Sequence, residues 1–331
     1  MQKLLQLLII FFSILTLKGQ VTLKDADTNL AISYASISFG NGNGIVADDE
    51  GIFIFTKALY PDIDSLFISA LGYKNLNIAS KDLKTLIFLE QKTSELDEVV
   101  INARIKKEIN LNRKFKTRSL KPFLDDDYYH CWLPTIESEI AVHFPNEDKK
   151  VKRLASIKFP IALESKDWKK RKQANNNKRK FSTLFKVNIY DSKDGKPNNN
   201  LNKTPIVFRT TEQDGDYHQL NISSYNILIP DDGIFISLQV LGYTDKNGKL
   251  LPNKKYKEIK AKDRVVKIPT NFRPLLPFTD KVEANRTYIK RVFISNNEWK
   301  LFKKGNGFKS SLLKSGLNNY GIGIDVDIFK D

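Results

Sequence analysis

The sequence contains a single cysteine, Cys131, and only three histidines among its 331 residues. One thiol cannot form an intrachain disulfide, nor can it supply a cysteine-rich zinc module. His130, His143 and His218 leave little material for a histidine metal site or a general base. The sequence also lacks a P-loop, a dinucleotide-binding glycine motif, a zinc-protease H-E-x-x-H and a serine-hydrolase elbow. We therefore expect no catalytic residues of a known linear motif, no cofactor and no metal.

Long apolar runs are equally scarce, and the one of note is Leu4–Leu17, which follows Lys3. This run is shorter than the ~20 residues that cross a bilayer, and a basic residue before a short apolar run is typical of a secretory signal. We predict that residues 1–19 are a signal peptide cleaved near Gly19 or Gln20, with an uncleaved anchor as the alternative. No cysteine lies at the end of the run, where a lipoprotein anchor needs one. No transmembrane segment is expected after cleavage.

The chain has enough apolar material for folded domains, because 41% of its residues are hydrophobic and 11% are aromatic. Its length has room for roughly two domains. The net charge of +16 is unevenly distributed. Residues 20–101 hold six lysines and twelve acidic residues, whereas residues 102–331 carry an excess of twenty positive charges. Such asymmetry predicts two modules with different surfaces.

The first module alternates short apolar stretches with turn residues. Ala35–Phe39 places apolar and hydroxyl side chains on opposite faces of a strand, and the following G-N-G-N-G forms a turn between strands. A phosphate cradle would need a helix after those glycines. Ile45–Ala47 and Ile52–Phe55 form a hairpin with Gly51 at its turn. About seven short strands of this kind predict an all-β sandwich.

The same residues carry a resemblance to a known family. The order A-S-I-S-F, G-N-G-N-G, I-V-A-D-D-E-G-I-F-I-F and S-L-F-I-S-A-L-G-Y-K resembles the carboxypeptidase-like regulatory domain. The best-matched positions are Gly44, Val46, Asp48, Gly51, Phe53, Gly72 and Tyr73. The resemblance covers residues 20–92 and implies a transthyretin-like, Ig-like sandwich of seven strands. Such domains are common in exported proteins of Bacteroidetes and precede the plug of SusC-like TonB-dependent receptors.

The rest of the chain fits neither a zinc carboxypeptidase nor a TonB-dependent receptor, two classes of protein in which such domains are found. No histidine is followed by glutamate at the third position, so the H-x-x-E zinc ligands of the peptidase are absent. The barrel of a 22-stranded receptor needs more than ~400 residues. The sequence after Ile101, residues 102–331, is much too short for such a barrel. The domain is therefore expected here without a peptidase or a receptor barrel.

A basic stretch, residues 93–125, is predicted to link this module to a second β-domain at residues 126–331. Within the stretch, Asn102–Lys121 reads either as a short amphipathic helix or as an extended linker. Alternating patterns predict strands farther on, at Ser138–Phe144, Val151–Phe159, Phe185–Tyr190, Ile206–Arg209, Tyr217–Leu220, Gly233–Leu241, Arg264–Ile268, Tyr288–Ser295 and Ile322–Phe329. Asp191–Asn200 reads as a turn. This pattern predicts a larger sandwich, of the jelly-roll type.

The most unusual feature is a basic segment, Lys149–Lys180, with thirteen basic and two acidic residues. It favours an anion-binding loop in which an aromatic ring can stack on a sugar or a base. The candidate contacts are Trp168, Lys169, Lys170, Arg171, Lys172, Lys178, Arg179 and Lys180. The alternative is a solvated hairpin loop whose composition reflects an AT-rich genome.

Other chemistry-bearing residues are better explained structurally. His130 and Cys131 are neighbours, and neighbours on a strand point to opposite faces, so Cys131 is expected to be a partly buried structural residue. Paired aspartates suggest calcium ligands, but none has the EF-hand spacing, and most sit beside turn residues. These are Asp25/Asp27, Asp125–Asp127, Asp191/Asp194, Asp231/Asp232 and Asp325/Asp327. Nothing in the sequence selects a carboxylate pair for glycoside hydrolysis.

These features together predict a non-catalytic exported envelope protein with a binding or structural role, in contact with glycan or anionic envelope components. One alternative is an accessory partner of a TonB-linked outer-membrane uptake system. Another is a glycan-processing enzyme without a linear motif. The expected partners are a glycan, lipopolysaccharide or an outer-membrane protein, and no nucleic acid is expected for an exported chain. The periplasm or the outer membrane is the expected location, with the cell surface as the alternative.

Overall fold

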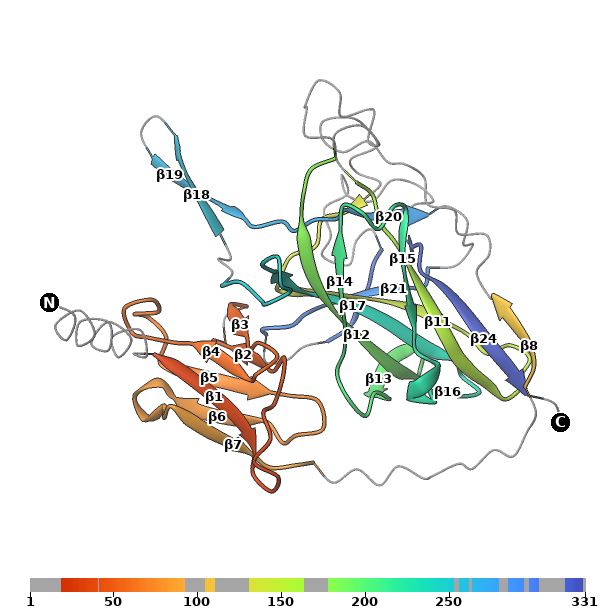
Figure 1. Cartoon of the computed structure of the whole chain (residues 1–331), viewed down its shortest axis with the longest axis horizontal. Coiled ribbons are helices and arrows are strands. Elements are labelled where there is room, and N and C mark those ends of the chain that lie inside the picture. The colour runs from red at the N-terminus through yellow and green to blue at the C-terminus, as the bar shows by residue number, and fades with distance from the viewer. Residues whose placement is uncertain are drawn as a thin grey trace, which may run out of the picture. The chain divides into compact units, whose positions relative to one another are not determined.

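The computed structural model describes residues 19–40, 42–92, 105–110, 131–163, 178–252, 256–261, 264–279, 285–294, 298–303 and 319–329. The chain divides into two compact units, Met1–Ser94 with Phe293–Ser295, and Glu95–Val292 with Asn296–Asp331. Both are built from strands, so the predicted all-β class is confirmed (Figure 1). The predicted signal peptide lies outside the described residues except for Gly19. Within those residues, no helix is long and apolar enough to cross a membrane.

The first unit contains two sheets. In one, β1 lies between β4, to which it is antiparallel, and β7, to which it is parallel. The other has the antiparallel order β3-β2-β5-β6. The strands are β1 (Gln20–Asp25), β2 (Ser36–Ser38), β3 (Gly44–Val46), β4 (Ile52–Ile54), β5 (Ser65–Ser69), β6 (Leu76–Ala79) and β7 (Leu86–Leu89), with a 3₁₀ turn η1 (Ser80–Asp82).

One apolar core joins these two sheets into a sandwich. Along β1 the buried side chains alternate with half-buried ones, so that Val21 and Leu23 point inward. They pack in the same cluster as Ile37 of β2 and Leu66 and Ile68 of β5, which belong to the other sheet. The alternation visible in the sequence therefore marks the buried face, as expected for a sheet with one face on a core.

The largest sheet of the second unit has the order β13-β12-β17-β10-β21-β22, and β14 also pairs with β12. Its pairings are all antiparallel. The strands are β10 (Ser138–Phe144), β12 (Ser182–Lys193), β13 (Lys196–Asn200), β14 (Ile206–Thr211), β17 (Ile234–Tyr243), β21 (Thr287–Arg291) and β22 (Lys300–Leu301).

A second sheet has the order β15-β11-β24-β8, with β16 also paired to β11 (Figure 1). Its strands are β8 (Ile105–Asn110), β11 (Lys152–Pro160), β15 (Tyr217–Asn221), β16 (Leu228–Ile229) and β24 (Gly323–Phe329), and a 3₁₀ turn η4 (Ser223–Tyr225) follows β15. Smaller elements are the sheet β23-β20-β9 and the hairpin β18–β19. Their bounds are β9 (Cys131–Trp132), β18 (Tyr256–Ala261), β19 (Arg264–Pro269), β20 (Leu276–Thr279) and β23 (Asn319–Tyr320).

Aromatic side chains connect the two larger sheets of the second unit across their shared core. Phe159 of β11 stacks on Phe208 of β14, with ring centroids 4.9 Å apart. Phe208 in turn stacks on Phe185 of β12, at 5.6 Å. All three side chains are buried. The two sheets thus face one another as layers of a sandwich.

Two of the sequence interpretations need correction. The helix alternative for Asn102–Lys121 is wrong for Ile105–Asn110, which forms strand β8 and pairs with β24. The turn expected over the whole of Asp191–Asn200 is much tighter, because β12 runs to Lys193 and β13 begins at Lys196. Only Asp194 and Gly195 form the turn, with φ values of 52° and 69°. Positive φ at both central residues is what a two-residue hairpin loop requires.

Candidate functional site

The sheet containing β10, β12 and β17 has one apolar face and one mixed face, on which polar side chains lie beside the small cluster of Ala141, Tyr190 and Phe235. Ile140, Val142 and Phe144 of β10 are fully buried on the apolar side. On the mixed face, a row crosses four strands: Lys186 of β12 faces Gln239 of β17, Gln239 faces Glu139 of β10, and Glu139 faces Lys290 of β21. Directly opposed residues of paired strands project from the same face of the sheet. We call Lys186, Gln239, Glu139 and Lys290 the polar row.

Glu139 is the centre of this row and is only 2% exposed. Its Oε1 atom accepts hydrogen bonds from Asn188 Nδ2 at 2.9 Å, from Tyr190 OH at 3.0 Å and from the hydroxyl of Ser237. Burial by itself would raise the pKa of Glu139, but the charge of Lys290 and these hydrogen bonds outweigh burial and hold that pKa below its ordinary value. Glu139 is therefore a carboxylate inside the protein.

Lys290 is fully engaged by its neighbours. Its Nζ lies 3.0 Å from Glu139 Oε2 and donates to Tyr190 OH at 3.1 Å. The same ammonium lies 5.0 Å from the ring centroid of Tyr190 and 4.6 Å from that of Trp299, within the range of cation–π attraction. Burial acts to lower the pKa of Lys290, but Glu139 and Tyr190 act more strongly together and raise it.

Gln239 differs from these two residues because its buried amide donor has no acceptor, and Lys186 is the residue that faces it on the next strand. Lys186 is 8% exposed, and no residue in the described part of the chain forms a hydrogen bond or ion pair with its Nζ. Burial lowers the pKa of Lys186, Lys290 lowers it further, and Glu139 opposes both. Gln239 is 3% exposed, and its Nε2 atom has no hydrogen-bond partner. Buried donors without acceptors are rare and costly.

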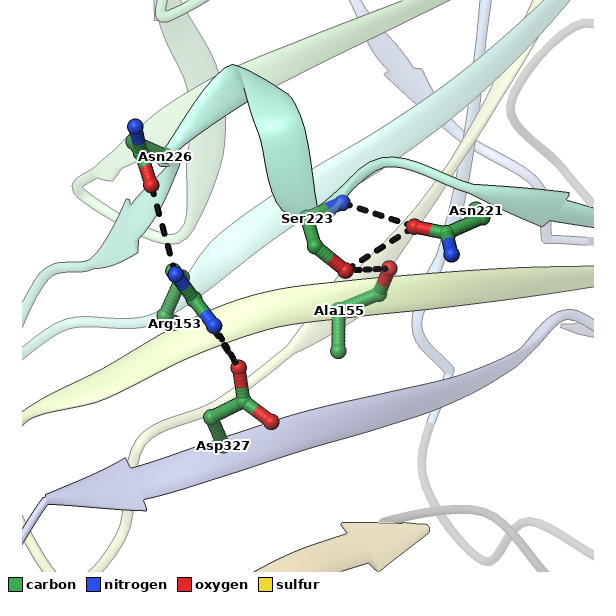
Figure 2. Close-up of polar contacts among 6 residues, drawn as sticks. All are labelled: Arg153, Ala155, Asn221, Ser223, Asn226 and Asp327. Carbon is green, nitrogen blue, oxygen red and sulfur yellow. Dashed lines mark hydrogen bonds and ion pairs between the residues drawn. The ribbon is translucent and has the colours of Figure 1, made fainter. Parts of the chain in front are cut away.

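The outward side of the five-stranded sheet carries a different polar cluster, shown in Figure 2. Arg153 of β11 donates to the Asp327 carboxylate of β24 through Nε at 2.9 Å and also through Nη2. Its Nη1 reaches Asn226 Oδ1 at 3.3 Å (Figure 2). Asn226 ends the 3₁₀ turn η4 in a left-handed conformation, with φ of 50°. This ion pair therefore ties β11 both to β24 and to the turn after β15.

The same turn is held to β11 at an irregularity in the pairing between Leu154 and Ser156. The Ser223 hydroxyl donates to the Ala155 carbonyl at 3.2 Å, and Ser223 also bonds to Asn221 Oδ1 through its Oγ and its backbone N–H (Figure 2). An extra residue in one strand leaves backbone groups out of the ladder, and here a neighbouring turn satisfies the carbonyl. We interpret the cluster as a structural clasp.

The aspartates proposed as calcium ligands are placed by such contacts. Asp325 accepts from Ser156 Oγ at 2.6 Å and pairs with Lys158 at 3.1 Å, while Asp327 pairs with Arg153. Asp191 accepts from the Asn199 backbone and side chain. Within the described residues, no group of three or more His, Cys, Asp or Glu side chains could hold a metal. Asp125–Asp127 lie outside those residues.

The basic segment is only partly described. Trp168, Lys169, Lys170, Arg171 and Lys172 lie outside the described residues. Lys178 is half-buried, and Arg179 and Lys180 are exposed directly before β12. Three of its other basic residues lie in β11 and form ion pairs, namely Lys152 with Asp148, Arg153 with Asp327 and Lys158 with Asp325. The segment therefore contributes less free positive charge than its composition indicates.

In the first unit, the motif residues of the resemblance build turns and the core. Asp48 Oδ1 accepts the backbone N–H groups of Glu50 at 3.0 Å and Ile52 at 2.8 Å. Gly51 has φ of 73°, and a Cβ there would lie 2.7 Å from the Leu23 carbonyl oxygen. Phe53 is buried in the sandwich core. These three positions shape the hairpin between β3 and β4.

The remaining motif residues also have structural explanations. Tyr73 OH donates to Asp25 Oδ2 at 2.8 Å, and burial together with Asp25 raises the pKa of Tyr73 to about 12. Gly72 adopts φ of 82° with open space around it. A Cβ on Gly44 would overlap the ring of Phe293, so only glycine fits there. None of these contacts points to a ligand site.

Asp25 was not singled out as a motif residue, yet it is the polar centre of the first unit. It is 2% exposed. Its Oδ1 accepts the backbone N–H groups of Thr28 and Asp27, both at 2.8 Å, and Gln91 Nε2 donates to its Oδ2 at 2.7 Å. These bonds, the one from the Thr28 N–H first and that from Gln91 next, hold the pKa of Asp25 well below its usual range. The signal in the sequence is the Asp-rich turn D-A-D-T-N.

The cysteine and histidines are also set in structural surroundings. Cys131 is 5% exposed and packs against Ala162 and Leu275. His143 stacks on Phe235 with ring centroids 4.5 Å apart, and burial lowers its pKa. His218 Nδ1 lies 2.7 Å from Asp214 Oδ1. His130 lies outside the described residues.

Three comparisons with known proteins add no relative: no family, no curated protein and no solved structure matches the chain. The resemblance to the carboxypeptidase-like regulatory domain therefore stays a prediction. The candidate site is therefore inferred from its own residues, which combine a buried ion pair, Glu139 with Lys290, and a buried donor without an acceptor, Gln239 Nε2.

The polar row is not visible in the sequence. In Ser138–Phe144 the residues Glu139, Ala141 and His143 alternate with apolar ones, and a face of this kind normally points to solvent. The F-K-V-N-I-Y stretch of β12 has the same alternation. Nothing in either pattern reveals that both polar faces are buried together.

Proposed function

We propose that the chain is an exported, non-catalytic envelope protein whose second unit binds an anionic glycan or another anionic component of the envelope. The first unit serves in this proposal as a carboxypeptidase-like regulatory domain, supported by its sandwich of a three-stranded and a four-stranded sheet. The apolar run at Leu4–Leu17 supports export to the periplasm or the outer membrane.

The observation that carries the proposal is the placement of positive charge at the start of β12. Arg179 and Lys180 are exposed immediately before this strand, at the end of the basic segment. The neighbouring cations of β11, Arg153 and Lys158, are half-buried and pair with Asp327 and Asp325, whereas Arg179 and Lys180 are exposed to solvent. Exposed cations attract polyanions over roughly a Debye length, about 8–10 Å near physiological salt.

A binding titration tests this proposal. The purified full chain is titrated with polygalacturonate and with vesicles containing lipopolysaccharide, at 50 and 300 mM salt, with neutral dextran as the uncharged reference. Binding to at least one polyanion is expected to weaken with salt, because exposed charges are screened. The triple variant Lys178→Ser, Arg179→Ser and Lys180→Ser should lose up to about a hundredfold in affinity, at about 1 kcal/mol for each charge near an anionic surface.

The matched control removes three other exposed lysines from the same unit, at Lys193, Lys196 and Lys203. It changes the net charge by the same amount and should bind nearly as well as the unmodified chain. Equal loss in both triple variants would reduce the effect to net charge and contradict a specific anion surface. Absence of binding to either polyanion at 50 mM salt would sink the proposal.

A further inference from the structure

We propose that the second unit also holds a buried site for a single oxyanion, the carboxylate or phosphate group of a small ligand, between Lys186 of β12 and Gln239 of β17. These residues are direct partners in the register of two neighbouring strands. Opposed side chains on one face start about 5 Å apart at their Cβ atoms. One oxyanion is therefore within reach of both.

The hydrogen bonds of the polar row leave an acceptor missing at this place. Oε1 of Glu139 is occupied by three donors, from Asn188, Tyr190 and Ser237, and Oε2 by Lys290. Gln239 Nε2 is thus a buried donor without an acceptor, beside an acid whose oxygens already serve other groups, and Lys186 is the buried residue that faces it. Leaving such a donor unpaired costs folding free energy, which a bound acceptor would recover.

The charges of the polar row decide what kind of acceptor fits. Glu139 is the one carboxylate of the row and already pairs with Lys290, so Lys186 has no acid of its own there. A neutral hydroxyl or a water would satisfy the hydrogen bonds but would bring no counter-charge for Lys186. An oxyanion satisfies both needs at once, and hydrogen bonds between charged partners are roughly twice as strong as neutral ones.

Lys290 does not compete for the ligand. Its ammonium is held by Glu139 and Tyr190, and it lies over the rings of Tyr190 and Trp299. Lys186 is the cation of the row that no described residue holds. The inferred site differs from the exposed surface at Arg179 and Lys180 in its burial, its residues and its ligand, which is one small group instead of a polyanion. The inference of this site can therefore be tested independently of the proposed function.

Thermal unfolding of the full chain tests the inference. Inorganic phosphate and acetate are titrated separately, with chloride keeping the ionic strength constant. A ligand that binds only the folded chain raises the unfolding temperature in a saturable way. At least one of the two anions is expected to do so. Phosphate alone would identify a phosphate site, and acetate alone would identify a carboxylate site.

Variants then locate the effect. Lys186→Met should weaken the apparent affinity for the active anion at least tenfold, and Gln239→Leu should weaken it several-fold. The matched control is Lys193→Met, which removes an exposed lysine from the same strand and should leave the affinity unchanged. If Lys186→Met does not fold, Gln239→Leu and NMR of the Lys186 ammonium during the titration carry the test. That signal should shift with the same apparent affinity.

Two results would overturn the inference. If neither anion gives a saturable rise in the unfolding temperature of the unmodified chain, no oxyanion site exists. If the rise is the same in Lys186→Met, or in Gln239→Leu with an unchanged Lys186 signal, the anion binds at the surface. The triple variant at Lys178, Arg179 and Lys180 should retain the rise, which separates this site from the exposed surface.

Discussion

The two units bury their acidic side chains in different ways. In the first unit, Asp48 accepts backbone N–H groups two and four residues farther along the chain, and Asp25 accepts two backbone N–H groups from its own turn. In the second unit, Glu139 accepts from side chains of distant strands and pairs with Lys290. Acids of the first kind shape a turn, whereas Glu139 joins four strands of one sheet.

The largest expected effect is the loss of the cross-strand acid. Glu139→Gln leaves Lys290 buried without a counter-charge, and breaking a buried ion pair from one side costs about 3–5 kcal/mol. Urea denaturation measures this loss in the free energy of unfolding. Glu147→Gln is the control, because Glu147 is exposed in the turn after β10. The double variant with Lys290→Met should recover part of the loss. A change below about 1 kcal/mol in Glu139→Gln would mean that water reaches the pair.

A smaller effect is expected where a local turn is broken. Gly51 and Gly72 both have positive φ, but a Cβ on Gly51 meets backbone atoms whereas a Cβ on Gly72 meets open space. Gly72→Ala should cost about 1 kcal/mol from conformation alone. Gly51→Ala should cost at least about 2 kcal/mol, because crowding adds to the strain. Denaturation curves of the two variants measure the loss in the free energy of unfolding. Equal losses would show that the backbone at Leu23 can move away from the added Cβ without a further energetic cost.

A fall in pH should destabilise the first unit through the protonation of Asp25. The pKa of Asp25 is lowered in the folded chain, so the unfolded chain binds the proton more tightly. Its contribution to stability is therefore complete above the unfolded value of about 3.8 and is lost as the pH falls through the lowered value. Asp25→Asn should be less stable at pH 7 and flatter between pH 2 and 5, measured by urea midpoints. The pH dependence of the Gln91→Leu variant should be intermediate between that of the unmodified chain and that of Asp25→Asn. If the urea midpoint of Asp25→Asn falls with acid as steeply as that of the unmodified chain, Asp25 does not have this role.

The smallest change is expected at Lys186, and it should stabilise. Its pKa is lowered by burial, so the unfolded chain binds the proton more tightly, and stability rises with pH from the folded pKa towards the unfolded value near 10.5. In chloride buffer, Lys186→Met should add about 1 kcal/mol at pH 7, because an unpaired buried charge is removed. That advantage should shrink at pH 9.5. Destabilisation by Lys186→Met at both pH values would show that Lys186 has a partner in the folded chain.

The contrast between local and long-range contacts also explains what the sequence could predict. Strand alternation and turn residues are local properties, so the strand at Ser138–Phe144, the hairpin at Gly51 and the all-β class were all predictable. The ends of the strands were less predictable, because the strands they pair with determine where they end. β12 extends to Lys193 since β13 pairs with its end.

The candidate site could not be predicted, because it depends on register between distant strands. Lys186, Gln239 and Lys290 meet Glu139 only through pairings between strands that lie far apart in the chain, and no sequence pattern fixes those registers. For the same reason, the sequence overestimates the unpaired positive charge of the basic segment. Its basic composition is evident from the sequence, but Arg153 and Lys158 pair with acids of β24, which lies more than 150 residues farther along the chain.

The place of β24 in its sheet has a consequence for the order of folding. This strand, Gly323–Phe329, lies between β11 and β8 and is hydrogen-bonded to both, although most of the second unit separates it from β11 in the chain. A growing polypeptide that has not yet reached Gly323 exposes one edge of β11 with unpaired backbone groups. Such long-range pairing is slow and leaves incomplete chains open to aggregation and proteolysis. Synthesis must pass Phe329 before the layer can close.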